Sequence, residues 1–75
     1  MKTVLSEDIC RSYIPIIASC GYDLQRMDPF RIGQCVRTTG FSYDDVESVV
    51  RMCHSSVLLR ELYNTFRNDS PVIRN

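Results

Sequence analysis

Glycine, proline and long apolar runs are all scarce in this sequence. Its 75 residues include three glycines and three prolines, and no internal repeat or low-complexity segment divides the chain. No apolar run approaches the roughly eighteen residues that a membrane-spanning helix needs. The first residues turn acidic at Glu7 and Asp8, before the apolar core of a signal peptide could form. We therefore expect a cytoplasmic protein with no membrane partner.

The sequence also has no excess of positive or negative charge. Nine basic and nine acidic side chains give no net charge at pH 7, whereas a general polyanion-binding protein needs a positive surface to gain free energy from counterion release. Because 44% of the residues are hydrophobic, the composition is that of a globular chain rather than a disordered one. We expect one small domain at 1–68 and a flexible tail at 69–75.

The cysteines lack the close pairing that structural zinc sites usually show. They are Cys10, Cys20, Cys35 and Cys53, with nine, fourteen and seventeen residues between them. His54 follows the last of them, but adjacent side chains on a helix point about 100° apart and chelate poorly. The spacing favours buried thiols that act as small hydrophobic side chains. Zinc binding and a disulfide or redox role stay open as alternatives, and we predict no cofactor.

Capping residues and apolar periodicity predict an all-α fold, a compact single domain of four or five short helices. Ser6 can cap a first helix that runs to Cys20, and Gly21 suits the left-handed position after it. Pro15 removes one backbone donor from this helix, so we expect a kink there rather than a full break. The residues predicted on its inward face are Ile9, Tyr13, Ile16, Ile17 and Cys20.

A connector over 22–27, with one helical turn at most, leads to a second helix. Asp28 and Pro29 are typical of a helix start, and this helix should end near Thr39. Its apolar residues are Phe30, Ile32, Cys35 and Val36.

The third helix has the best-marked start in the sequence. Ser42 and Asp45 have the spacing of a capping box, and Phe41 and Val46 that of a hydrophobic staple. Its predicted inward residues are Val46, Val49, Val50 and Cys53.

A last amphipathic stretch runs from Val57 to Arg67, after a stop and restart at 54–56 where either serine can act as a cap. Its predicted inward residues are Leu58, Leu59, Leu62, Tyr63 and Phe66. An outward polar stripe consists of Arg60, Asn64 and Arg67.

The chain contains carboxylates, a histidine, cysteines and serines, which are residue types that enzymes use. Their spacing in the sequence does not match that of catalytic sites. The carboxylate pairs Glu7/Asp8 and Asp44/Asp45 lie at predicted helix starts, where the helix dipole already accounts for them. His54 has a cysteine and two serines beside it, but neighbours along a helix rarely place a nucleophile within reach of its base. The glycines are too widely spaced for a phosphate-binding loop. We predict that the chain is not an enzyme.

The segment from Gln34 to Arg51 resembles a helix-turn-helix motif, with Gly40 in the turn between two helices. The resemblance implies a helix-turn-helix-like hairpin and, as an alternative function, a DNA-binding transcriptional regulator. Arg26, Arg31 and Arg37 are the candidate phosphate contacts. The exposed start of the second helix is acidic, however, and carboxylates there would repel the DNA backbone. Binding of nucleic acid therefore ranks below binding of protein.

Residues 29–67 also resemble a ubiquitin-associated domain. That family of three-helix modules uses a Met-Gly-Phe-type loop and a leucine pair on its last helix. Here the corresponding segments are Thr39-Gly40-Phe41 and Val57-Leu58-Leu59, with threonine in the place of methionine. The resemblance implies a protein-binding module, as a second alternative.

Two predicted surfaces favour binding of another protein. One is the acidic start of the third helix, with Tyr43, Asp44, Asp45 and Glu47. The other is the polar stripe of Arg60, Asn64 and Arg67, with Tyr63 beside it. Arginine outnumbers lysine eight to one, and its planar guanidinium suits protein interfaces. We expect a small regulator that binds a larger protein, such as a component of the transcription machinery or another regulator, with a homodimer as a further form of association.

Overall fold

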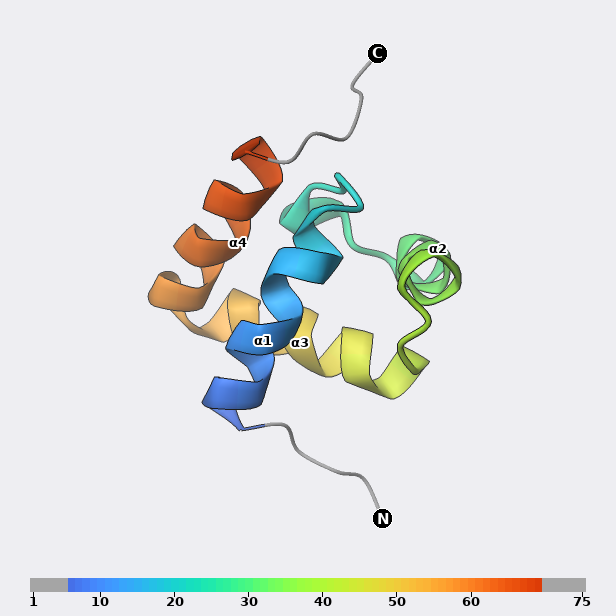
Figure 1. The fold of residues 1–75 in the computed structure, drawn as a ribbon, viewed down its shortest axis with the longest axis horizontal. Coiled ribbons are helices and arrows are strands. Elements are labelled where there is room, and N and C mark those ends of the chain that lie inside the picture. The colour runs from blue at the N-terminus through green and yellow to red at the C-terminus, as the bar shows by residue number, and fades with distance from the viewer. Residues whose placement is uncertain (1–5, 70–75) are drawn as a thin grey trace.

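The structure, a computed structural model, describes residues 6–69 and has the all-α fold that the sequence predicts (Figure 1). Its elements in chain order are α1 (Glu7–Ala18), the single 3-10 turn η1 (Leu24–Arg26), α2 (Pro29–Thr39), α3 (Tyr43–Ser55) and α4 (Val57–Asp69). None of these helices is long and apolar enough to cross a membrane. The tail predicted at 69–75 lies outside the described residues except for Asp69, which is the last residue of α4.

Polar side chains cap the helices at the predicted positions. Ser6, Asp28 and Ser42 each accept a hydrogen bond from the backbone N–H three residues further on, at 3.3, 2.8 and 3.2 Å. Ser56 caps α4 in the same way, at 3.3 Å. Each bond satisfies one of the backbone donors that a helix start leaves without a partner. Gly40 ends α2 in the left-handed conformation, with φ of 82°, which is the geometry that favours glycine after a helix.

The first helix continues through Pro15 without a break. The helix therefore does not break at the proline, and its buried residues on the two sides are Cys10, Ile14, Ile17 and Ala18. After Ala18 the chain turns sharply, with backbone hydrogen bonds of 3.0 Å from Cys20 to Ile17 and from Gly21 to Ala18. Gly21 has a φ of 88°, so the predicted left-handed glycine follows this helix.

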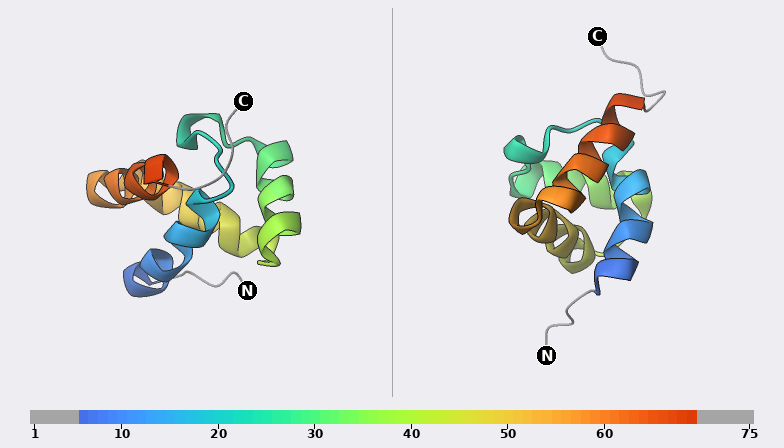
Figure 2. Two further views of the ribbon diagram at one scale, coloured as in Figure 1. Left: turned by 45° about the horizontal axis from the view of Figure 1, so that its top comes forward. Right: turned by 90° about the vertical axis from the view of Figure 1, so that its left-hand side faces the viewer.

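The core lies where α1, α3 and α4 meet. α4 and α2 lie on opposite sides of α1, and α3 crosses behind it (Figures 1 and 2). The buried residues form one cluster: Cys10, Ile14, Ile17, Ala18, Leu24, Ile32, Cys35, Val46, Val49, Val50, Cys53, Leu59 and Tyr63. Every helix contributes to this cluster, so the described residues share a single hydrophobic core.

Some apolar residues predicted to face inward are exposed. The prediction was wrong for Ile9 and Ile16 in α1 and for Leu58 and Phe66 in α4, and Leu58 is 70% exposed. Phe30 in α2 is 72% exposed. The physical reason is that each helix has neighbours along one stripe only, whereas its apolar residues span a wider arc. Residues at the margins of that arc are left in contact with solvent.

Two side chains of α4 fix the connector between α1 and η1. The hydroxyl of Tyr63 donates a 2.8 Å hydrogen bond to the carbonyl oxygen of Tyr22, and Nε of Arg67 donates a 3.3 Å bond to the carbonyl oxygen of Gly21. These carbonyls belong to a segment without regular structure, so side chains rather than a backbone ladder satisfy them. The connector is thereby held against the last helix.

Candidate functional site

The first turn of α3 places the predicted acidic residues together at one end of a helix. We call Tyr43, Asp44, Asp45 and Glu47 the acidic turn. Tyr43 is 39% exposed and Asp44 is exposed, while the other two are partly buried. The partial positive charge at the start of α3 favours carboxylates at this position, so the local structure explains why acidic side chains gather here.

The acidic turn meets little opposing positive charge. Three ion pairs occur within residues 6–69: Arg11–Glu7 at 2.9 Å, Arg31–Asp28 at 2.7 Å and Arg51–Glu47 at 3.8 Å. Only the last involves the acidic turn, and at 3.8 Å, with the Arg51 side chain exposed, this pair contributes little. Asp44 and Asp45 take part in none of the ion pairs in this part of the chain. The acidic turn therefore presents net negative charge to solvent.

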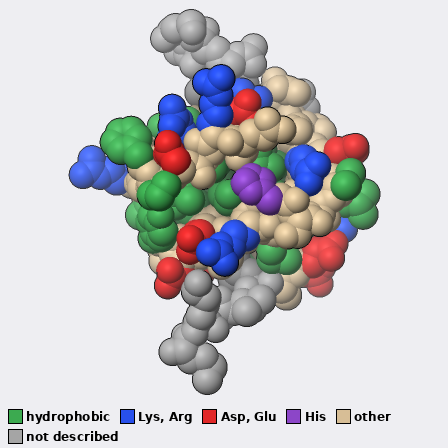
Figure 3. Space-filling view, turned by 180° about the vertical axis from the view of Figure 1, so that it is seen from behind, with side chains coloured by type: hydrophobic (Ala, Val, Ile, Leu, Met, Phe, Trp, Pro, Cys, Tyr) green, Lys and Arg blue, Asp and Glu red, His purple; other side chains and the backbone are tan. Residues whose placement is uncertain are grey.

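The arginines expected to contact DNA phosphates belong to two elements: Arg26 ends η1, whereas Arg31 and Arg37 lie in α2. Arg31 is paired with Asp28, whereas Arg26 and Arg37 are exposed. On the face opposite to that of Figure 1, acidic and basic side chains are interspersed (Figure 3). The hairpin formed by α2 and α3 keeps the order of a helix-turn-helix, and its reading as a DNA-binding motif stays a prediction.

The second predicted surface is largely engaged within the molecule. Tyr63 is fully buried, so its expected place on a partner-binding surface is corrected: it lies with the inward residues of α4. Nη2 of Arg60 donates a 2.8 Å hydrogen bond to the backbone carbonyl of His54, and Arg67 donates to the connector. Asn64 is exposed. The structure therefore leaves only part of this stripe available to a partner.

His54 joins α3 to η1 rather than interacting with the end of its own helix. Its Nε2 lies 2.9 Å from the carbonyl oxygen of Leu24, thirty residues earlier in the chain. Because a carbonyl can only accept, this bond requires the proton on Nε2. That nitrogen thus has a structural partner, which no local pattern predicts because the two residues are distant in the chain.

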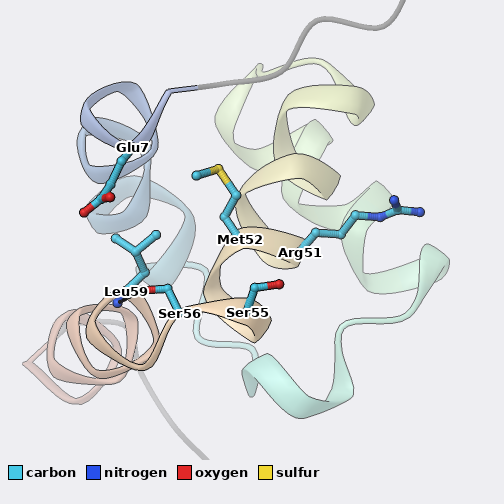
Figure 4. Close-up of a pocket in the computed structure, with 6 residues that line it drawn as sticks. All are labelled: Glu7, Arg51, Met52, Ser55, Ser56 and Leu59. Carbon is cyan, nitrogen blue, oxygen red and sulfur yellow. Dashed lines mark hydrogen bonds between the residues drawn. The ribbon is translucent and has the colours of Figure 1, made fainter.

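A shallow groove that no sequence pattern predicts lies between the start of α1, the end of α3 and the start of α4 (Figure 4). It has a volume of about 230 Å³ and is lined by Glu7, Arg51, Met52, Ser55, Ser56 and Leu59. Met52 points into the space between α1 and α3, whereas Arg51 extends away from Leu59 (Figure 4). This volume is below that of sites for drug-sized ligands.

All four cysteines are free thiols. Burial raises the pKa of the Cys10 thiol, and it raises that of the Cys53 thiol to about 12. Cys20 is half-buried, whereas the other three are buried. Within residues 6–69, no group of three or more histidine, cysteine, aspartate or glutamate side chains is placed to hold a metal ion.

The ubiquitin-associated pattern is divided between the core and the surface. The ring of Phe41 stacks on that of Tyr13, with centroids 4.4 Å apart. Leu59 is buried, while Val57 and Leu58 are exposed. Of the residues that carry this resemblance, Val57 and Leu58 are therefore the ones most accessible to a partner.

Comparison with known proteins assigns no family to the chain. No protein-family model, no curated protein and no solved structure matches it. Function must therefore be argued from the surfaces described above.

Proposed function

We propose that this chain is a small regulatory protein that binds a larger protein partner through the acidic turn. The observation that supports the proposal is the exposure of Asp44 and Tyr43 at the start of α3, where no ion pair within residues 6–69 neutralises Asp44. An aromatic ring beside a carboxylate offers a partner both apolar contact area and a negative charge that selects a basic surface. The partner surface that complements it is basic.

A component of the transcription machinery, or another regulator, is the class of partner that we propose. Proteins that handle nucleic acid have positive surfaces for phosphate binding. Exposed carboxylates complement such a surface and speed its association. The free thiols of the described residues suit a reducing compartment such as the cytoplasm. Self-association through the acidic turn is disfavoured, because it would bring like charges together.

The test compares two double variants with the same change of charge. Asp44→Arg with Asp45→Arg reverses the acidic turn, and Asp8→Arg with Glu61→Arg is the matched control on exposed residues of α1 and α4. Each tagged protein is used for affinity purification from its native cell with quantitative mass spectrometry, after circular dichroism has shown equal helicity. We expect the wild type and the control to retain the same partner. The amount of this partner recovered with the acidic-turn variant should be at least tenfold lower. Equal retention by all three proteins would refute this surface.

The DNA-binding alternative is supported by the order of α2, Gly40 and α3 alone. This alternative requires that the chain slow the migration of duplex DNA in a gel, and that added salt weaken the effect. The variant Asp44→Arg with Asp45→Arg should bind DNA more strongly, because two repulsive charges become attractive.

The ubiquitin-associated alternative is supported by the exposure of Val57 and Leu58. This alternative requires that the Leu58→Asp variant lose the partner and that the Asp44→Arg variant still bind it.

A further inference from the structure

The outer side of α2 carries four residues that recur at the i, i+3, i+4 and i+7 positions of the helix. They are Phe30, Gly33, Gln34 and Arg37, and we call them the α2 face. This spacing gathers them within an arc of about 100°. Ile32 and Cys35, the residues that α2 buries, lie on its other side. α2 packs against α3 and α1 and forms one edge of the molecule (Figures 1 and 2).

Two long side chains of the α2 face are exposed. Phe30, at 72%, is the most exposed of the large hydrophobic side chains in residues 6–69. Arg37 is exposed as well, and it takes part in none of the ion pairs among the residues that the structure describes. Aromatic rings and arginines are the residue types that most often anchor protein interfaces. The α2 face therefore offers two anchors that the monomer leaves exposed.

Gly33 gives the centre of this face a flat surface. A Cβ added at Gly33 would meet no atom within 4 Å, so the packing of the monomer does not require glycine there. Glycine inside a helix lowers the stability of that helix relative to alanine. What glycine provides at such a position is room for a second backbone to approach the helix closely.

The α2 face is also symmetric about its own centre. Phe30 and Arg37 lie at equal distances from its midpoint, about 5 Å along the helix axis on either side. A twofold axis through that midpoint and perpendicular to α2 places the ring of one copy over the guanidinium group of the other, and it does so twice. Interfaces in which one patch meets the same patch of a second copy are the commonest in soluble homo-oligomers.

Charge favours the antiparallel order of two such helices. The face of an aromatic ring is the negative part of its quadrupole, so the ring of Phe30 attracts the guanidinium group of Arg37. The Asp28–Arg31 ion pair at the start of α2 is neutral as a whole and adds no net repulsion there. In a parallel pair of helices, two Arg37 groups would lie opposite one another and repel. The α2 face is therefore complementary to its own reversed copy.

We propose that the chain forms a homodimer in which α2 packs antiparallel against α2 of a second copy. In this dimer, Phe30 of each copy contacts Arg37 of the other, and the two backbones approach at Gly33. Gln34 lies beside the twofold axis, where its amide can donate a hydrogen bond to its symmetry mate and accept one from it. The dimer uses no residue of the acidic turn, so it does not depend on the partner proposed above.

Sedimentation equilibrium of the full-length chain under reducing conditions tests the dimer, at chain concentrations from about 1 µM to 1 mM. A single helix pair is at the small end of the range of protein interfaces, so we expect a dissociation constant on the order of 100 µM. The average mass should rise with concentration toward twice that of one chain. A chain that stays monomeric over the whole range, or that exceeds twice this mass, would overturn the proposal.

Exchange of the two anchors tests the antiparallel order. Phe30→Arg should weaken the dimer roughly tenfold, because it sets two guanidinium groups against one another. Phe30→Arg combined with Arg37→Phe should return the dissociation constant to within about threefold of the wild-type value, since a ring again faces a cation. A double variant that dimerises no better than Phe30→Arg alone would contradict this order.

Gly33→Leu tests the close approach of the two helices. Leucine is a better helix former than glycine, so α2 stays helical, but the added side chain lies between the helices and should weaken the dimer roughly tenfold. Leu58→Ala and Arg51→Glu are the matched controls, at exposed positions outside α2, and should dimerise as the wild type does. Circular dichroism checks that every variant keeps its helicity. Equal weakening by the controls would overturn the assignment to α2.

Discussion

The hydroxyl of Tyr63 in α4 donates a hydrogen bond to the carbonyl oxygen of Tyr22, forty-one residues earlier in the chain. The ring of Tyr63 is fully buried, and burial raises the pKa of its hydroxyl, with the nearby Cys35 adding to the rise. The bond therefore satisfies two polar groups that folding removes from water. It is also one of the contacts that join the connector to the last helix.

Replacing this hydroxyl tests its contribution to stability. Tyr63→Phe keeps the ring and leaves the carbonyl of Tyr22 without this donor, so we expect the free energy of unfolding to fall by about 1 kcal/mol. Urea denaturation followed by circular dichroism measures the change. Tyr43→Phe, at an exposed ring, is the matched control and should alter stability by less than about 0.5 kcal/mol. Equal effects of the two substitutions would show that the buried bond contributes nothing.

Two glycines of the same helix should respond to alanine in opposite directions. An added Cβ meets no atom within 4 Å at either Gly33 or Gly40, so available space does not distinguish them. Gly40 has a φ of 82°, in which alanine is strained, and Gly40→Ala should destabilise the fold by about 1 kcal/mol. Gly33 lies inside α2, so Gly33→Ala should stabilise it by about 0.5–1 kcal/mol. Thermal melts of both variants test the contrast, and a shift in the same direction for both would contradict it.

The stacked pair of Tyr13 and Phe41 should anchor the loop between α2 and α3 on α1. Their rings lie 4.4 Å apart at an interplanar angle of 11°. We expect Phe41→Ala to lower the free energy of unfolding by roughly 2 kcal/mol, because it removes the stack and part of the apolar contact. Phe30→Ala makes the same chemical change at a ring that is mostly exposed, and it should have little effect. Chemical denaturation of the two variants provides the comparison.

Stability should decrease in alkaline solution. Burial raises the pKa values of Cys10 and Cys53, the latter to about 12, above the ordinary thiol value of 9.0. The unfolded chain therefore loses these protons first as the pH rises above about 9, and the free energy of unfolding falls. Each such group contributes a slope of at most about 1.4 kcal/mol per pH unit. Cys20 acts in the opposite sense between about pH 7 and 9, because its pKa is lowered to about 7 in the folded chain.

Urea denaturation under reducing conditions at pH 7, 9 and 10 measures this dependence. Cys53→Ala should show a shallower fall between pH 9 and 10 than the wild type, since one of the shifted groups is gone. A free energy of unfolding that rises across that interval would contradict the prediction.

Local features of the fold were predictable because their causes lie within a few residues. The caps Ser6, Asp28 and Ser42 act on the N–H three positions away. The sequence also predicted that α1 would continue past Pro15, because the apolar spacing keeps its phase there. Such features depend on backbone geometry and side-chain type, and both can be read from a short window.

Features that depend on distant contacts could not be predicted in this way. Periodicity identifies the arc of a helix that can be buried, but it does not say how much of that arc a neighbour covers, and Leu58 was misplaced for this reason. The contacts of His54 with Leu24 and of Tyr63 with Tyr22 join residues that only the tertiary fold brings together. The acidic turn was predictable as a local cluster, whereas the burial of Tyr63 follows from how α4 packs.

The bonds from Tyr63 and Arg67 to the connector also set the order of events during synthesis. The ribosome adds residues from the amino terminus, so Gly21 and Tyr22 emerge long before the side chains that bond them. A nascent chain stopped before position 63 lacks both donors. The connector can therefore make these two hydrogen bonds only after α4 has left the exit tunnel, so its final arrangement forms after the first three helices have emerged.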